Sequence, residues 1–141
     1  SGSCRFRRSP STRNTSQNRC VMRLFLLDSV SAVTAEMRGQ CVVTGSHGGV
    51  SAAHLALAHP PGFVAFNDAG FGLDNAGIAS LEILEQAGVA AFTVSHASAR
   101  IGDAASTLAT GRVSAVNACA ARLGVGLGDS TRDVVDRLLQ G

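Results

Sequence analysis

The chain has 141 residues, of which 45% are hydrophobic and 16% are charged, and this balance predicts one globular domain with a well-buried core. Every apolar run is shorter than the ~18 residues that a membrane-spanning helix requires. The Arg-rich start is also unlike a secretory signal, because it leads into only LFLL.

The formal net charge of +2 conceals an asymmetry. Six of the twelve arginines and no acids lie in residues 1–23, whereas six arginines and ten acids follow, a net −4. We predict that residues 1–22 are a disordered basic tail or an artificial extension, with Met22 as the natural start. Residues 23–141 are then a single α/β domain. A nucleic-acid arm is the alternative for the tail, but nothing else in the chain supports it.

The residue types present exclude several kinds of chemistry. The chain contains no Lys, Tyr or Trp, which excludes a Lys Schiff base, a Walker lysine and a Tyr proton donor. The four cysteines are scattered, with neither a C-x-x-C pair nor a zinc-finger spacing. We therefore expect reduced thiols and a cytoplasmic protein.

In chain order, four short apolar runs predict strands buried on both faces, as in a parallel sheet, because each is continuous rather than alternating. These runs are residues 24–27, 41–44, 63–66 and 89–94.

Helical patterns fall between and after these runs, at residues 49–58, 75–87, 103–109, 114–123 and 130–140. Pro60-Pro61 and Gly88 end the first two of them, and Ser114 is a candidate cap for the fourth. Arg112-Val113 offers a place for a fifth strand. The alternation predicts a three-layer α/β sandwich, Rossmann-like or flavodoxin-like, with a mostly parallel sheet of four to five strands and helices on both faces.

Polar residues with useful chemistry follow each predicted strand. They are the pairs Asp28-Ser29, Ser46-His47, Asn67-Asp68 and Ser95-His96. Because ligands of open α/β sheets bind at the carboxyl ends of the strands, we predict a site at this edge. The plainer alternative is ordinary loop chemistry.

The first Ser-His pair lies among glycines, in Gly45-Ser46-His47-Gly48-Gly49. These glycines favour a tight strand-to-helix turn whose free amides bind an anion. The turn differs from the G-x-S-x-G nucleophile elbow, since a histidine holds its central position. We predict that Ser46 and His47 are catalytic and that Gly48 and Gly49 bind substrate. A capping or structural role is the alternative for His47.

The second polar stretch is NDAGFGLDNAG. Asp68 is predicted to be catalytic, by orienting a histidine or binding an amine or metal, and Asn67 to bind substrate. Asp74 or Asn75 is expected to cap the following helix. The Gly-x-Gly within the stretch does not open a G-x-G-x-x-G fingerprint, so dinucleotide binding is not indicated.

The third stretch, SHASARIGD, is the densest in functional groups. His96 is predicted to be catalytic, and Ser95, Ser98, Arg100 and Asp103 to bind substrate. The guanidinium of Arg100 suits a carboxylate or phosphate because its fork binds two oxygens at once. An ion pair between Arg100 and Asp103 is the alternative.

If neighbouring strands carry them, His47, His96 and Asp68 form a two-His, one-carboxylate group that suits a divalent metal. The same three side chains also suit metal-free acid–base catalysis. No organic cofactor is expected.

This pattern favours a small cytoplasmic enzyme, a hydrolase or lyase acting on a small anionic substrate with a carboxylate or amide group. Ser46 or water is the nucleophile, His47 or His96 the base and Arg100 the anion clamp. The alternative is a non-catalytic small-ligand-binding or regulatory α/β domain. We also expect a homo-oligomer, and neither a membrane nor a nucleic acid as partner.

Overall fold

The computed structural model describes residues 23–70 and 78–140. The predicted tail in residues 1–22 and the predicted cap at Asp74 or Asn75 therefore lie outside the described residues. Within the described ranges, no helix combines the length and the apolar character needed to cross a membrane.

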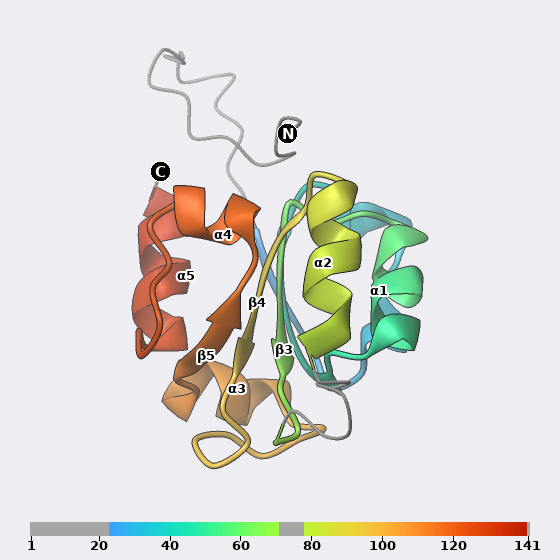
Figure 1. Ribbon diagram of the computed structural model, residues 1–141. Coiled ribbons are helices and arrows are strands. Elements are labelled where there is room, and N and C mark those ends of the chain that lie inside the picture. The colour runs from blue at the N-terminus through green and yellow to red at the C-terminus, as the bar shows by residue number, and fades with distance from the viewer. Residues whose placement is uncertain (1–22, 71–77, 141) are drawn as a thin grey trace.

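A five-stranded sheet forms the centre of the protein, with its strands side by side in chain order (Figure 1). The strands are β1 (Leu24–Leu27), β2 (Cys41–His47), β3 (Phe63–Asn67), β4 (Ala90–Val94) and β5 (Val113–Val116). Strands β1 to β4 are parallel, and β5 is antiparallel to β4. The predicted mostly parallel sheet is confirmed. Its order never reverses, unlike the strand orders of Rossmann and flavodoxin folds.

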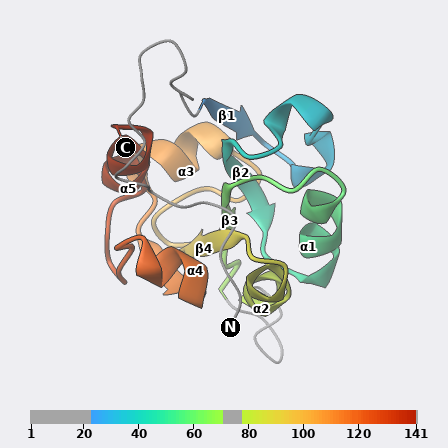
Figure 2. The ribbon, with the colours of Figure 1, turned by 90° about the horizontal axis from the view of Figure 1, so that it is seen from above.

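Helices cover both faces of the sheet (Figure 2). One face carries η2 (Val30–Ala32), η3 (Ala35–Met37), α1 (Val50–Leu57) and α2 (Ala79–Gln86). The other carries α3 (Ala104–Thr110), α4 (Ala118–Arg122) and α5 (Thr131–Gln140). The connections β1–β2, β2–β3 and β3–β4 each lead to the next strand in the same direction across the sheet. Because such crossovers are right-handed, the helices of all three connections lie on one face. The predicted three layers are confirmed.

The strand side chains alternate between two cores. Cys41, Val43 and Phe92 pack toward α5, whereas Val42 and Phe66 pack toward α1 and α2. Because both faces are buried, each strand reads as a continuous apolar run rather than as an alternating one.

The fourth predicted helix begins too early, because residues 113–116 form β5. Asn117 starts α4 instead, and its Oδ1 accepts a hydrogen bond from the amide of Ala120 at 3.0 Å. The same buried amide group also bonds the backbone of Leu81, Val89 and Ala91. The fifth strand is therefore confirmed, and Ser114 is not a helix cap.

The cysteines differ from the expectation of reduced thiols. Cys119 is disulfide-bonded, so that prediction is wrong for this residue. Cys41 is a free thiol in the core, and burial raises its pKa to about 12.

Candidate functional site

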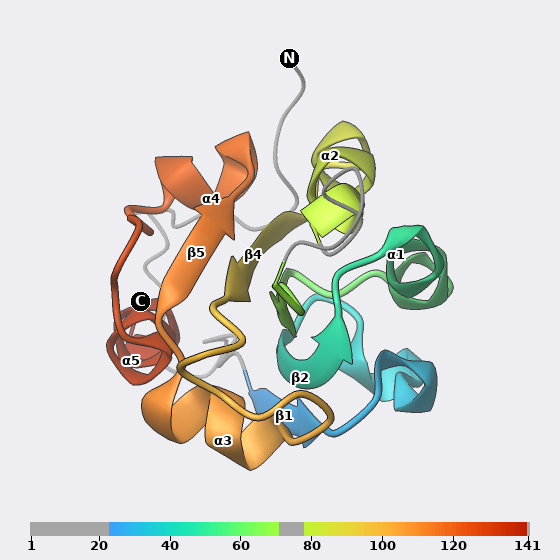
Figure 3. The same cartoon turned by 60° about the horizontal axis from the view of Figure 1, so that its bottom comes forward.

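The carboxyl ends of the parallel strands meet at one edge of the sheet, which we call the rim (Figure 3). His47 pairs in register with Asn67, and Asn67 pairs with Val94. The ends of β2, β3 and β4 are therefore level, and the polar residues that follow them share this edge. The predicted gathering of these segments at one edge is confirmed.

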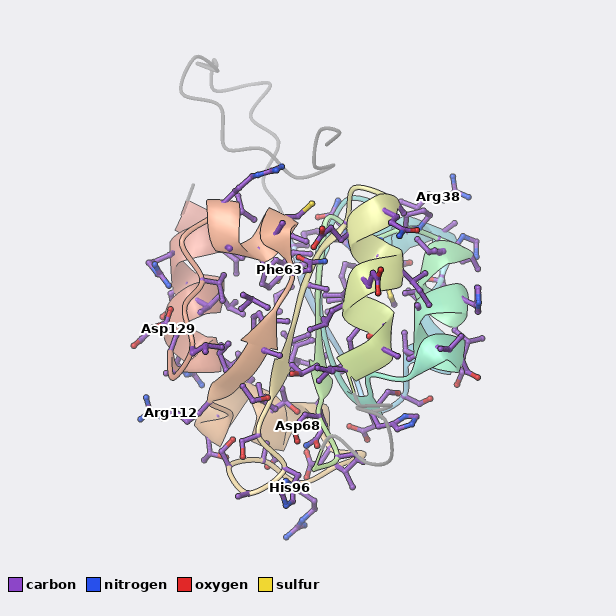
Figure 4. The ribbon with its side chains drawn as sticks, in the orientation of Figure 1. Arg38, Phe63, Asp68, His96, Arg112 and Asp129 are labelled. Atoms are coloured by element: carbon purple, nitrogen blue, oxygen red, sulfur yellow. The ribbon has the colours of Figure 1, made fainter. Side chains whose placement is uncertain are left out.

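An Asp–His pair lies on the rim (Figure 4). Asp68 is buried, and its Oδ1 accepts hydrogen bonds from the amides of Gly70 at 2.8 Å and His96 at 3.1 Å. The same oxygen lies 3.6 Å from Nδ1 of His96, whose side chain is 61% exposed. This separation is longer than a hydrogen bond but within reach of a charge interaction. Nδ1 of His96 is therefore the ring nitrogen beside the carboxylate, and Nε2 lies on the other side of the ring.

A strained turn holds this pair. Ala69 and Gly70 both have left-handed backbones, with φ of 51° and 76°, and a non-glycine residue seldom adopts this conformation. Asn67 Oδ1 accepts from the Ala69 amide at 2.8 Å, and Asp68 holds the amide of Gly70. A Cβ on Gly70 would lie 3.5 Å from the His96 ring. Our sequence reasoning missed both turn residues, although an Asn-Asp pair followed by Ala-Gly is typical of such turns.

Asn67 also ties the turn to the segment that follows β4. Its side chain is buried, and its Nδ2 donates to the carbonyl of Ala99 at 3.1 Å. Both ends of the amide group are therefore engaged within the protein. These contacts favour a positioning role for Asn67 over the predicted contact with substrate.

Residues 95–103, which we call the rim loop, lie directly against β2. The amide of Gly102 donates to the carbonyl of Gly45 at 2.6 Å. A Cβ on Gly45 would lie 2.6 Å from the carbonyl carbon of Gly102 and closer still to the Asp103 nitrogen. Glycine at position 45 therefore permits this close approach, rather than only a tight turn.

Two carboxylates at the rim cap α3. Asp103 accepts from the Ser106 amide at 3.0 Å, and Asp28, after β1, accepts from the Ala104 amide at 3.0 Å. Within the ranges that the structure describes, Arg100 and Asp103 form no ion pair, and the exposed guanidinium of Arg100 has no protein partner. Arg100 is thus free to meet a ligand, whereas Asp103 has a structural function.

The three serines predicted at the site all make local contacts. Ser46 Oγ accepts from the Val30 amide at 2.8 Å and, among described residues, bonds no histidine. Ser95 Oγ accepts from the amide of Ala97, and Ser98 Oγ donates to the carbonyl of Ser95 at 2.8 Å. These contacts stabilise the loops of the rim and favour structural roles for all three hydroxyls.

His47 and the glycines after it lie at the end of β2. His47 is exposed, whereas Gly48 and Gly49 are buried. The Gly48 amide donates to the carbonyl of Asn67 at 3.0 Å, and Gly49 is the N-terminal cap residue of α1. The predicted strand-to-helix turn is therefore present.

The predicted metal group does not form among the described residues. They contain no cluster of three His, Cys, Asp or Glu side chains arranged to hold a metal ion. Asp68 and His96 are close. His47 lies at the end of β2 and pairs with β3, so the whole width of β3 separates it from β4. Adjacent strands lie about 4.8 Å apart, so His47 is about 10 Å from the β4 end of the rim.

An open groove of about 600 Å³ lies beside α5, with Arg112, Asp129 and Arg137 among its lining residues. Arg137 pairs with Asp129 at 3.3 Å, and Arg112 Nη1 donates to the Gly128 carbonyl at 3.4 Å. Because these charges have partners within the protein, we assign no site there.

Comparison of the chain with protein-family models, with curated proteins and with solved structures gave no match. Its function is therefore argued from the rim itself.

Proposed function

We propose that this chain is a small enzyme, a hydrolase or lyase, that uses His96 for acid–base chemistry on a small anionic substrate with a carboxylate or amide group. The observation that supports this proposal is the buried Asp68 carboxylate, 3.6 Å from Nδ1 of the exposed His96. A buried carboxylate beside an exposed imidazole is one arrangement that general acid–base catalysts use.

In this proposal, neutral His96 accepts a proton at Nε2. In a hydrolase the proton comes from an attacking water; in a lyase it comes from the carbon next to the substrate carboxylate. Asp68 stabilises the imidazolium that forms, and the same nitrogen then returns the proton to the leaving group. Such proton transfer contributes typically ~10²–10⁴-fold to a rate.

Water is a better nucleophile than Ser46 in this arrangement, because the Ser46 hydroxyl is bonded to the Val30 amide and, among described residues, to no histidine. Arg100 and His47 are both exposed at the rim. They would hold the negative end of the substrate, since the neighbouring carboxylates are bonded to backbone amides.

A substrate screen tests this function. Small esters, amides and 2-hydroxy acids that carry a carboxylate would be incubated with the full chain, and turnover would be followed by NMR. For any substrate found, we expect His96→Gln to lower kcat about 100-fold or more. His54→Gln is the matched control, because His54 is an exposed histidine on α1 that is not part of the proposed site.

Equal rates for the wild type and His96→Gln would refute the proposed role. If a screened compound binds tightly but is not turned over, even after divalent metal ions are added, the result would favour the non-catalytic ligand-binding alternative. The cytoplasmic location, the homo-oligomer and the use of a divalent metal remain predictions.

A further inference from the structure

The sheet has an open edge along β1 (Figure 2). The Arg23 carbonyl accepts from the Cys41 amide at 3.0 Å, and the Arg23 amide donates to Oε1 of Gln40 at 2.7 Å. Both backbone groups of Arg23 therefore face β2. Successive residues of a strand direct these groups to alternate sides, so the amides and carbonyls of Leu24 and Leu26 face away from the sheet. Among the described residues they have no hydrogen-bond partner, since β2 is the only strand beside β1.

The opposite edge, along β5, is covered. The amide of Val113 donates to the Asp129 carbonyl at 2.9 Å, and the Gly128 amide donates to the Val113 carbonyl at 2.8 Å. Arg112 and Ser130 form a further antiparallel bridge. The loop before α5 thus pairs with one edge of the sheet, whereas the described residues leave the other edge open.

β1 lacks the features that usually protect an open edge, which are charged side chains, proline and bulges. Its sequence, LFLL, contains neither a charge nor a proline, and it pairs with β2 without a register shift. Leu26 is 44% exposed. An apolar edge of this kind pairs readily with another strand.

The surfaces beside this edge are also uncharged. Residues 29–35, which include η2, follow β1 on one face of the sheet, and α3 packs against β1 on the other. Neither segment contains a charged side chain or a histidine. By contrast, α5 carries Arg132, Asp133, Asp136 and Arg137. Loss of charge distinguishes the centre of a protein–protein interface from other surface, and these flanks add to the area of the strand edge, since a stable interface needs about 800 Å² from each partner.

We propose that a second copy of this chain pairs with β1 through its own β1, antiparallel and about a two-fold axis, so that the two five-stranded sheets become one continuous sheet. Leu24 of each copy lies opposite Leu26 of the other, because these residues carry the outward groups, and Phe25 lies at the axis. Each Leu24–Leu26 pair exchanges both of its backbone hydrogen bonds, and every outward group of the strand gains a partner. This interface does not rest on the proposed function.

Charge and closure favour a second copy over a different partner. Exposed Arg23 precedes β1 and exposed Asp28 follows it, so an antiparallel pair brings the positive end of each strand beside the negative end of the other. Arg23 faces Glu36 of its own chain at 3.7 Å, but such exposed pairs contribute little. The contact uses the same edge of both copies, and the β5 edges at the two ends of the joined sheet are covered. The assembly therefore stops at a dimer.

Sedimentation equilibrium of the full chain, from micromolar to millimolar concentration, tests the assembly. We expect a dimer with twice the chain mass of 14.4 kDa. Hydrogen exchange followed by NMR then locates the interface. The amides of Leu24 and Leu26 should be protected in the dimer and lose protection on dilution. The amides of Phe25 and Leu27 are the internal control, because they face β2 and should be protected at every concentration.

Two substitutions of Leu26 test the pairing. Leu26→Pro removes an amide that faces away from β2, a position at which an edge strand tolerates proline. It deletes one hydrogen bond donated by each copy, so the Kd of the dimer should rise about 30-fold. Leu26→Lys keeps the amide but adds a charge to the edge, and it should also favour the monomer. Far-UV circular dichroism checks that both variants remain folded.

Leu127→Lys is the matched control. Leu127 is 69% exposed and directly precedes Gly128 at the covered β5 edge, so this variant should dimerise with the Kd of the wild type.

A wild type that stays monomeric at millimolar concentration would overturn the proposal. In such a monomer, protected amides at Leu24 and Leu26 would show that β1 is covered from within the same chain, and rapid exchange would show that the edge stays open or takes a different protein. A dimer that neither Leu26 substitution weakens would also overturn it, because its interface would lie elsewhere.

Discussion

Substituting Gly45 by alanine tests how the rim loop is attached to the sheet. The added Cβ would lie 2.6 Å from the carbonyl carbon of Gly102, a separation that requires the backbone to move. Overpacking of this kind costs about 1–3 kcal/mol. Loss of the Gly102–Gly45 hydrogen bond adds about 1 kcal/mol, so we expect Gly45→Ala to lower the free energy of unfolding by about 2–4 kcal/mol.

Urea unfolding measures this loss. With an m-value of about 2 kcal/mol/M, the middle of the range for a small protein, the midpoint should fall by about 1–2 M at constant m. Gly126→Ala is the matched control, because a Cβ there meets only Asp129 oxygens, at 3.7 Å and beyond, and its φ is ordinary. That substitution should be neutral or stabilising by up to about 1 kcal/mol. Equal midpoints for the two variants would show that the loop is not clamped against β2.

Two further predictions concern single residues. Burial raises the pKa of Cys41 from 9.0 to about 12, so the neutral thiol stabilises the fold fully below pH 9, and this stability is lost as the pH rises from 9 toward 12. Between pH 9 and 10 the wild type should lose about 1 kcal/mol more than Cys41→Ala in urea unfolding, and equal losses would refute the burial argument. Gly70→Ala and Gly39→Ala each place a side chain at a φ above +70°, which costs about 1–2 kcal/mol. Only Gly70→Ala should also shift the His96 ring signals in NMR, because a Cβ on Gly39 meets nothing within 4 Å; matching ring spectra would contradict the packing of His96 on Gly70.

The sequence predicts the parallel strands well because burial on both faces makes each one a continuous apolar run. β1 coincides with the predicted range of residues 24–27. β5 was mistaken for the start of a helix because its four residues are too few to show a period, and three of them are only partly buried. The cap at Asn117 depends on contacts with β4 and α2, which no local pattern contains.

The position of the candidate site was predictable, but the contacts of its residues were not. Parallel strands bring Asp68 and His96 to one edge, and this follows from the order of strands and helices alone. The roles of Ser46 and Asp103 depend on which backbone amide comes within reach of each side chain. Those approaches result from the rim loop packing on β2, which depends on the tertiary fold.

The strand order also determines which parts of the chain form the rim. A sheet that never reverses has no crevice between diverging crossovers, so the surface of the rim comes from loops. The connection from β4 to α3 supplies one by crossing the rim, and α3 then packs beneath β1 and β2 (Figure 3).

This crossing directs the N-terminus of α3 at the rim, where Asp28 and Asp103 both bond its amides. Asp68 is bonded in the same way by the turn after β3. The fold thus uses its own rim carboxylates to hold backbone amides, while the guanidinium of Arg100 is exposed and has no protein partner among the described residues. If this reasoning is correct, Asp28→Asn should weaken the hold on the N-terminus of α3 and speed the hydrogen exchange of the α3 amides, which NMR would measure; unchanged exchange would contradict it.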